Sequence, residues 1–432
     1  MTMDKKKITK EKAIGYHLGG KIGLDLRTPL NDEIDLSLAY TPGVADVCRL
    51  IENDPGSAFT HTAKKNTVAI VTDGTAVLGL GDIGPLASIP VMEGKAVLFK
   101  AFADVDGWPV PLEGVRLGGN TGKSDPDAFV ETAARLAVMY GGINIEDVAA
   151  PACFEIEDRL REMLDIPVFH DDQHGTAIIS LAGLKNYLHL TGKNIADIKI
   201  VINGGGAAGI RIGELFRYAG AKNILMCDSK GVIHDGRTDL NVQKQQFSVG
   251  TDDCCLRDVM KNADVFIGVS LPNLVDEDMV KSMAPEPAVF AMSNPDPEIR
   301  PEKVHAARDD AYSATGRSDY PNQINNVLGF PFIFRGALDV RASDISMNMK
   351  IACSKALADL ARETVPEYIR SAYGGIDIEF GREYLIPKPF DRRVFVNAST
   401  AVAEAAMRDG IARTPVDIAA YRKALAAKAE RL

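Results

Sequence analysis

The stretch Ile198-Lys199-Ile200-Val201-Ile202-Asn203-Gly204-Gly205-Gly206-Ala207-Ala208-Gly209-Ile210 decides the fold. An apolar run of strand length leads into a glycine-rich turn, and apolar residues at helical spacing follow. The glycines fit the pattern G-x-G-x-x-G at Gly204, Gly206 and Gly209. This order predicts a Rossmann-type parallel sheet in which the turn binds the pyrophosphate of a dinucleotide. We expect Ala207 and Ala208 to contribute to the same cofactor site.

The next apolar run, Ile224–Cys227, ends at Asp228. It lies about 20 residues beyond the glycine turn, where a carboxylate binds the ribose hydroxyls of NAD. Ser229 and Lys230 follow and could instead hold a 2′-phosphate. A glycine-rich turn without a ligand is the alternative, but strand, helix and acid together favour a cofactor site. We predict a nicotinamide cofactor and leave NAD and NADP open.

Strand-like runs also occur on both sides of this segment, separated by helical stretches. The further runs are Val68–Val71, Ile143–Ile145, Ile166–Phe169, Val265–Ile267 and Val289–Ala291. Alternating strands and helices are typical of α/β proteins. We therefore predict an N-terminal α/β domain (1–178), a doubly wound Rossmann-type domain (179–345) and C-terminal helices (346–432) that pack back on both.

Composition narrows the class of partner. The 432 residues carry 49 Lys and Arg against 59 Asp and Glu, a net charge of -10, which does not favour nucleic acid or anionic membranes. Six cysteines without a C-x-x-C spacing argue against a zinc ribbon or a disulfide scaffold. The basic N-terminus lacks the apolar run of a signal peptide, and no run is long enough to span a bilayer. We expect a cytoplasmic protein.

Two acidic pairs, Glu146-Asp147 and Asp171-Asp172, each follow a predicted strand. The carboxyl ends of parallel strands face one crevice, so both pairs could enter one site. Three clustered carboxylates suit Mg²⁺ or Mn²⁺. Spacing alone leaves solvated turns as an equal alternative. His170 and His174 flank the second pair, and we expect them to cap or pack rather than to bind a metal.

Two further side chains are candidate functional residues because of their positions. Tyr40 precedes Thr41-Pro42, good N-terminal residues for a core-facing helix over 44–51. Lys95 lies on a helical stretch with an apolar face, and beside a metal its pKa would fall through desolvation and like charge. A packing aromatic and a solvated lysine are the simpler alternatives.

Three other segments give definite structural expectations. The second glycine-rich run, 79–84, is predicted to be a tight turn without a clean helix behind it, because prolines follow. The segment 104–127 is predicted to be a surface loop, since Pro109 and Pro111 suit a central strand poorly. The last helix is predicted to begin with Thr414 as its N-cap.

Taken together, these segments resemble a malic enzyme of the shorter, prokaryotic type. The matching strings are LAYTPGVA (38–45), DGTAVLGLGDIG (73–84), PVMEGKAVLFKAF (90–102), GGINIEDVAAPACFEIE (141–157), IPVFHDDQHGTAI (166–178), INGGGAAGI (202–210), SNPDPE (293–298) and TGRSDYPNQINNVLGFPFIFRGALDV (315–340). They span most of the chain in one order. Because the chain ends at Leu432, we expect it to lack the acyltransferase-like extension that some members carry.

The resemblance implies metal-dependent oxidative decarboxylation of L-malate to pyruvate and CO₂ with reduction of NAD or NADP, in a homodimer or higher homo-oligomer. It implies that Lys95 takes the C2 hydroxyl proton, that Tyr40 protonates C3, and that Asp171 orients Lys95 or the groups around the metal. The remaining assignments that it implies are the metal ligands Glu146, Asp147 and Asp172, and the substrate and nicotinamide-ribose contacts Asn294 and Asn326. It also slightly favours NADP over NAD as the cofactor.

One departure from the family concerns substrate binding. Longer members carry a carboxylate-binding arginine where this chain has Ala76, so the partner must come from elsewhere, such as Arg317, another loop or a neighbouring subunit. The nearest alternative function is an oxaloacetate decarboxylase without net redox chemistry. An amino-acid dehydrogenase would not need three clustered carboxylates, and a dinucleotide-sensing module would tolerate loss of Lys95 and Tyr40.

Overall fold

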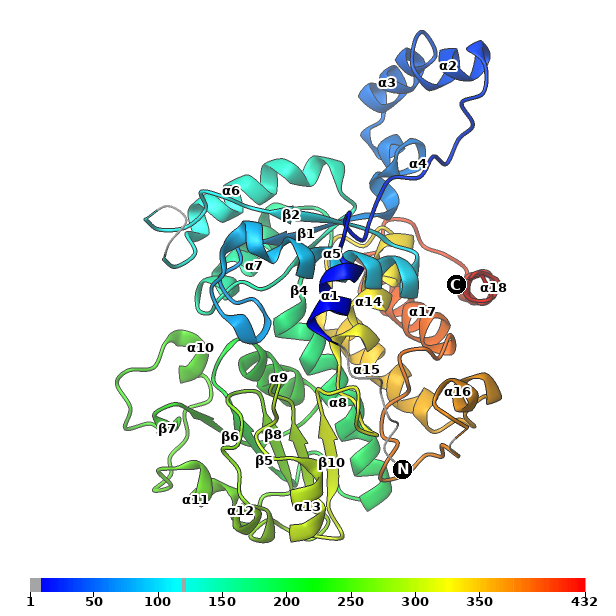
Figure 1. Ribbon diagram of the computed structural model, residues 1–432. Coiled ribbons are helices and arrows are strands. Elements are labelled where there is room, and N and C mark those ends of the chain that lie inside the picture. Colours follow the sequence, from blue (N-terminus) through cyan, green and yellow to red (C-terminus); the bar gives the residue numbers. More distant parts are fainter. Residues whose placement is uncertain (1–8, 119–121, 376, 432) are drawn as a thin grey trace.

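The computed structural model describes residues 9–118, 122–375 and 377–431. Two parallel sheets with helices around them form the body, one sheet lying above the other in Figure 1. Helix α8 (Asp171–Thr191) starts at the end of the first sheet and runs down beside the second. The α/β fold class predicted from the sequence is confirmed.

The first sheet has the order β2-β1-β3-β4 and is parallel throughout. Its strands are β1 (Thr67–Thr72), β2 (Asp106–Pro111), β3 (Gly142–Ile145) and β4 (Val168–His170). The prediction of a surface loop over 104–127 was wrong here. Because β2 is an edge strand, Pro109 and Pro111 can lack an N–H without breaking a central ladder.

The second sheet has the order β10-β9-β8-β5-β6-β7, with β5 inside it. Its strands are β5 (Lys199–Asn203), β6 (Asn223–Asp228), β7 (Gly231–Val232), β8 (Val265–Gly268), β9 (Ala288–Ala291) and β10 (Tyr312–Thr315). Only β7 runs antiparallel to its neighbour. The glycine turn leaves β5 and enters α9 (Ala207–Tyr218), as the sequence predicted.

The C-terminal helices pack on α8, and α15 (Met347–Ala361) contacts both α8 and α17 (Arg393–Arg408). The helices of the first half are α1 (Lys10–Tyr16), α2 (Glu33–Ala39), α3 (Val44–Asn53), α4 (Ala58–His61), α5 (Gly84–Ala103), α6 (Pro126–Leu136) and α7 (Ala152–Met163). Those of the second half are α10 (Val242–Gln245), α11 (Leu256–Met260), α12 (Glu277–Lys281), α13 (Pro301–Ala307), α14 (Phe330–Asp339), α16 (Glu367–Ala372) and α18 (Ile418–Ala429).

Three predicted helix features need correction. Helix α3 begins at Val44, not at Pro42, and none of its residues is buried. Helix α18 is capped by Asp417 rather than Thr414, because the Asp417 carboxylate accepts the N–H of Ala420. A helix does follow the run 79–84: α5 starts at Gly84 and contains two prolines, of which Pro85 occupies the first turn, where its missing N–H costs nothing.

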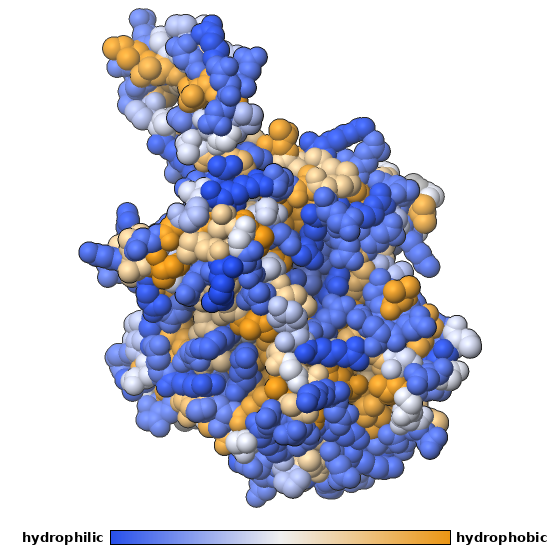
Figure 2. Space-filling model, turned by 180° about the vertical axis from the view of Figure 1, so that it is seen from behind, coloured by the Kyte–Doolittle hydropathy of each residue, from blue (hydrophilic) through white to orange (hydrophobic). Residues whose placement is uncertain are grey.

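Residues 28–54, which contain α2 and α3 and are called the arm below, project from the body (Figure 1). Its hydrophobic side chains are largely exposed, and Figure 2 shows them gathered as an orange patch on the arm. The aliphatic side chains Leu30, Ile34, Leu36 and Leu38 are each more than half exposed. An apolar surface of this kind marks an interaction site.

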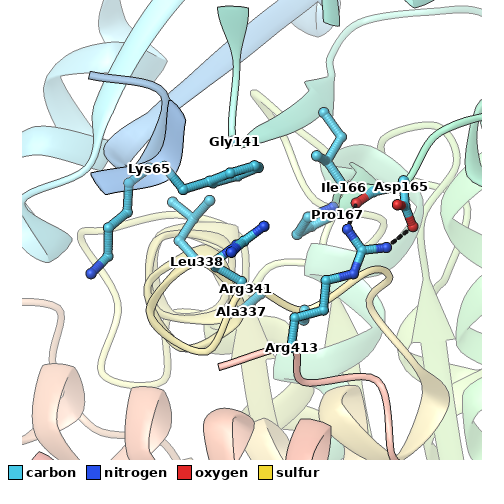
Figure 3. Close-up of a pocket in the computed structure, with 11 residues that line it drawn as sticks. Lys65, Gly141, Asp165, Ile166, Pro167, Ala337, Leu338, Arg341 and Arg413 are labelled. Atoms are coloured by element: carbon cyan, nitrogen blue, oxygen red, sulfur yellow. Dashed lines mark hydrogen bonds and ion pairs between the residues drawn. The ribbon is translucent and has the colours of Figure 1, made fainter. Parts of the chain in front are cut away.

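The root of the arm is attached firmly. The Arg341 guanidinium lies 4.1 Å from the centre of the Phe59 ring of α4. Figure 3 shows Leu338 and Arg341 at the end of α14 facing Gly141 and Pro167, which directly precede β3 and β4. Arg413 forms an ion pair with Asp165 at the same place. The arm therefore leaves the body from a packed base.

In the parts of the chain that the structure describes, no helix combines the length and apolar character that crossing a bilayer requires. The cytoplasmic location expected from the sequence stays a prediction.

Candidate active site

Four carboxylates and one ammonium group meet at the carboxyl ends of β3 and β4. Helix α5 carries Lys95 into this cluster, where its Nζ lies 2.7 Å from Glu146 Oε1 and 2.6 Å from Asp171 Oδ2. The ammonium group also lies 4.2 Å from the centre of the Phe330 ring. The structure thus brings both acidic pairs together with Lys95, as we expected.

Glu146, Asp147 and Asp172 offer carboxylate oxygens that all lie within 4.8 Å of one another. Asp172 Oδ2 also accepts the backbone N–H of Asp147 at 2.8 Å, which ties the two strand ends together. With Asp171, four carboxylates face one ammonium, a formal charge of -3. Asp171 Oδ1 is buried without a hydrogen-bond partner among the described residues. Hard oxygen donors with uncompensated negative charge fit Mg²⁺ or Mn²⁺.

The charges of the cluster shift the pKa values of its own members. Burial acts to lower the pKa of Lys95, but Asp171 and Glu146 outweigh it and raise that pKa above its usual range. The lowered pKa expected from the sequence applies to Lys95 beside a metal, and it stays a prediction. Burial raises the pKa of Glu146 well above normal despite Lys95, and Asp172 adds to that shift. The cluster holds more negative charge than its one cation can compensate.

Asn326 lies at the edge of the cluster, at the start of a short turn before α14. Its Nδ2 donates to Asp171 Oδ2 at 3.0 Å, and its Oδ1 accepts the Thr176 hydroxyl at 2.9 Å. Asn294 follows β9, and its carbonyl lies close to Gly79 of the 79–84 turn. Both asparagines therefore border the region between the first sheet and the glycine turn.

Tyr40 is the predicted catalytic residue that the structure does not bring to the cluster. It ends α2 on the arm, and 70% of its surface is exposed, whereas Lys95 is buried in the body. Figure 1 places α2 well away from α5. Within one chain, the site therefore lacks the tyrosine.

The glycine turn is shaped by close backbone approaches. Gly204 has a φ of +131°, and a Cβ there would lie 2.6 Å from the carbonyl of Val269. At Gly209 a Cβ would lie 1.8 Å from the carbonyl of Gly204. A Cβ at Gly206 would meet nothing within 4 Å, so this position faces open space, where a pyrophosphate would lie.

Asp228 ends β6, but its carboxylate is already occupied. Arg237 donates to both oxygens at 2.8 and 3.0 Å, and Lys244 Nζ lies 2.5 Å from Oδ2. Although burial acts to raise it, these hydrogen bonds lower the pKa of Asp228 to about 2. Lys230 pairs with Asp239 instead. The strand end therefore presents two cations around one acid, which the sequence reasoning missed.

Comparison with protein families agrees with this geometry. The profile described as "Malic enzyme, N-terminal domain" matches residues 22–161, and "Malic enzyme, NAD binding domain" matches residues 173–370. The chain belongs to the malic enzyme family. The first matched region contains Lys95, Glu146 and Asp147, the second contains the glycine turn, and Asp171 and Asp172 lie between the two.

Two relatives in the malic enzyme family illustrate the likeness. The NADP-dependent malic enzyme of Rhizobium meliloti is 51% identical over 98% of this chain and 55% of its own length. The NADP-dependent malic enzyme of Halomonas elongata is 50% identical over 94% of this chain and 95% of its own length. The chain thus spans about half of the first relative and nearly all of the second.

A solved structure gives the same result for the fold. The crystal structure of malic enzyme from Pyrococcus horikoshii matches with a TM-score of 0.85 and 39% identity. The match covers 97% of this chain and 95% of that one. The malic enzyme fold therefore extends over nearly the whole chain.

The structure also contains a buried arginine that no motif indicated. Arg116, from the segment predicted to be a loop, is buried and forms an ion pair with Asp82 of the 79–84 turn. The nearby Ser124 hydroxyl hydrogen-bonds to Asp73. The candidate Arg317 is instead engaged by Asp319 and by the carbonyl of Pro295. No sequence signal marked Arg116, because its pairing depends on the fold.

Proposed function

We propose that the protein catalyses the oxidative decarboxylation of L-malate to pyruvate and CO₂ with reduction of a nicotinamide dinucleotide. The observation that carries this proposal is the Lys95 ammonium between Glu146 and Asp171, directly beside the oxygens of the metal-binding trio. Family membership supports it, since the relatives from Rhizobium and Halomonas are named malic enzymes.

The chain's own residues define the first step. A divalent cation held by Glu146, Asp147 and Asp172 would polarise the C2 oxygen of malate and stabilise negative charge as CO₂ leaves. Like charge from that cation would lower the pKa of Lys95, and the neutral Lys95 amine is then the group positioned to take the C2 hydroxyl proton while hydride passes from C2 to the nicotinamide. Asp171 holds the Lys95 ammonium at 2.6 Å, and Asn326 fixes Asp171.

The last step needs a proton donor for C3, and we propose that Tyr40 of a second copy supplies it. Tyr40 lies on the arm, outside its own chain's cluster, and the side chains around it are exposed and apolar. A homodimer in which each arm lies on the other subunit would bury this surface and complete both sites. This arrangement supports the dimer expected from the sequence.

Mixed dimers test the exchange of Tyr40. Tyr40→Phe and Lys95→Met chains are each expected to be inactive as homodimers. When the two are unfolded and refolded together, random pairing makes about half of the dimers mixed. One of the two sites in each mixed dimer is complete, so about a quarter of wild-type activity should return. No recovery in dimers shown to be mixed would place Tyr40 in its own subunit's site.

We further propose NADP as the preferred cofactor. Arg237 and Lys244 compensate the Asp228 carboxylate, so this acid would not repel a 2′-phosphate. Asp239 pairs with Arg237 and Lys230, so three cations surround two acids near this strand end. The names of the Rhizobium and Halomonas relatives agree with this choice.

Absorbance at 340 nm tests the function directly. Purified protein with L-malate and Mn²⁺ should reduce NADP faster than NAD, and EDTA should abolish the reaction. If neither cofactor is reduced while oxaloacetate is still decarboxylated, the protein is an oxaloacetate decarboxylase without net redox chemistry.

A further inference from the structure

A buried polar cluster connects the two halves of the proposed active site. Its members come from α7, α8, α9 and α15, and we call it the interdomain cluster: Glu157, Gln173, His174, Arg211 and Lys350. Glu157 and Gln173 are fully buried, and Arg211 has only 13% of its side chain exposed. The cluster lies outside the residues proposed to touch substrate, metal or dinucleotide.

Arg211 is the member that joins α9 to α8. Its Nε donates to Gln173 Oε1 at 2.8 Å, and its terminal nitrogen lies 3.4 Å from Glu157 Oε2. Glu157 in turn accepts a hydrogen bond from His174 at 2.8 Å. Since a guanidinium group is planar and always charged, it holds these acceptors in a fixed direction.

Each end of this link lies beside a proposed ligand site. On α9, Arg211 follows the glycine turn by one helical turn, since the helix begins at Ala207. On α8, Gln173 directly follows Asp171 and Asp172, and the helix begins at Asp171. Because a helix moves largely as a rigid unit, a shift of either helix start is transmitted through Arg211 to the other.

We propose that Arg211 is a positioning residue that couples dinucleotide binding at the glycine turn to divalent-cation binding by Glu146, Asp147 and Asp172. This inference rests on the proposed function for the identity of the two ligands. Coupling of this kind is reciprocal, so each ligand strengthens binding of the other by the same factor.

Cation affinity measured with and without dinucleotide tests the proposal. Free Mn²⁺ is followed by its electron paramagnetic resonance signal in the absence of malate, so that no turnover occurs. In the wild-type protein, saturating NADP should tighten Mn²⁺ binding on the order of 10-fold. In Arg211→Met this ratio should fall toward one. Arg211→Lys keeps the charge beside Glu157 but loses the planar fork, and it should also lose most of the ratio.

Arg217→Met is the matched control. Arg217 lies on the same helix but stacks on Phe247, 4.1 Å from the ring centre, and donates to the carbonyl of Gln246. This variant should keep the wild-type ratio. A merely structural role for Arg211 would lower the melting temperature and both affinities while leaving the ratio unchanged.

The outcomes separate the two proposals. Wild-type protein that binds both ligands without coupling, or Arg211 variants that keep the ratio, would overturn this inference alone. Wild-type protein that binds neither Mn²⁺ nor a dinucleotide would overturn the proposed function and this inference together.

Discussion

At the scale of single residues, whether a charged side chain is compensated depends on partners that are distant in the sequence. Asp228 illustrates this, because its position after β6 was predicted, but its compensation by Arg237 and Lys244 was not. Those two cations follow the strand by 9 and 16 residues, in a segment without a motif. The predicted contribution of Ser229 and Lys230 to phosphate binding stays untested.

Lys244 offers the sharpest test of cofactor choice. Its Cε lies 3.2 Å from where a Cβ on Gly205 of the glycine turn would be. Loss of a charged hydrogen bond to a phosphate should raise the KM for NADP on the order of 10-fold in Lys244→Gln. The kcat/KM with NAD should stay near wild type. Lys261→Gln is the control, since Lys261 is exposed and pairs with Asp258, and steady-state kinetics with both cofactors compare the two variants.

Lys350 gives a prediction about pH and stability. Burial, partly opposed by Glu157, lowers the pKa of Lys350 from 10.5 to about 8. Between pH 8 and 10.5 the unfolded chain therefore binds more protons than the folded one, so stability rises with pH in this window, by at most about 1.4 kcal/mol per pH unit. Below pH 8 both states are protonated and the burial cost is constant.

The measurement compares wild-type protein with Lys350→Met by urea unfolding in EDTA at several pH values between 7 and 9.5. The wild-type free energy of unfolding should gain on that of the variant only above about pH 8. A difference that stays flat across the range would mean that the pKa of Lys350 is not lowered in the folded state.

At the scale of helices and strands, the sequence predicted the elements that are apolar and central. The runs that became β1, β3, β5 and β8 are buried along their length, so their hydrophobicity alone identified them. The strand β2 was missed because its prolines are tolerated only at an edge, and an edge position is set by neighbours. The same holds for α3, whose apolar face was predicted to meet the core but lies on the arm.

The glycine turn allows steric and ligand effects to be separated. Gly209→Ala would place a Cβ against the backbone of Gly204, so it should lower both the melting temperature and the dinucleotide affinity. Gly206→Ala meets no protein atom, so it should keep the melting temperature but lose affinity on the order of 10-fold or more, because the pyrophosphate approaches there. Calorimetry and dinucleotide titration compare the two variants, and equal melting temperatures would contradict the steric argument.

At the scale of the whole molecule, the active site lies between two sheets that fold from separate parts of the chain. The sequence predicted both halves and their order. The strand ends indicated that both acidic pairs could enter one site, and the family resemblance selected Glu146, Asp147 and Asp172 as metal ligands. The sequence could not predict which residues would join the halves. Glu157, Arg211 and Lys350 come from three helices and meet only when those helices pack.

Metal binding should therefore stabilise the whole fold. A cation that binds only the folded state adds about 2.7 kcal/mol at a concentration 100 times its Kd. Thermal unfolding with Mn²⁺ and with EDTA should show this gain in wild-type protein, and Asp172→Asn should lose most of it. Asp278→Asn, on the exposed face of α12, is the control. An equal gain in the Asp172 variant would argue against the trio as the binding site.

The exposed arm has a consequence for how the protein behaves on dilution. If each catalytic centre is shared between two chains, activity per milligram becomes a function of protein concentration, and it falls once pairs separate. Adding Lys95→Met chains to a highly diluted wild-type sample should then restore activity, because a chain without chemistry of its own can still lend its arm. A protein that lacks a working centre would act as an activator.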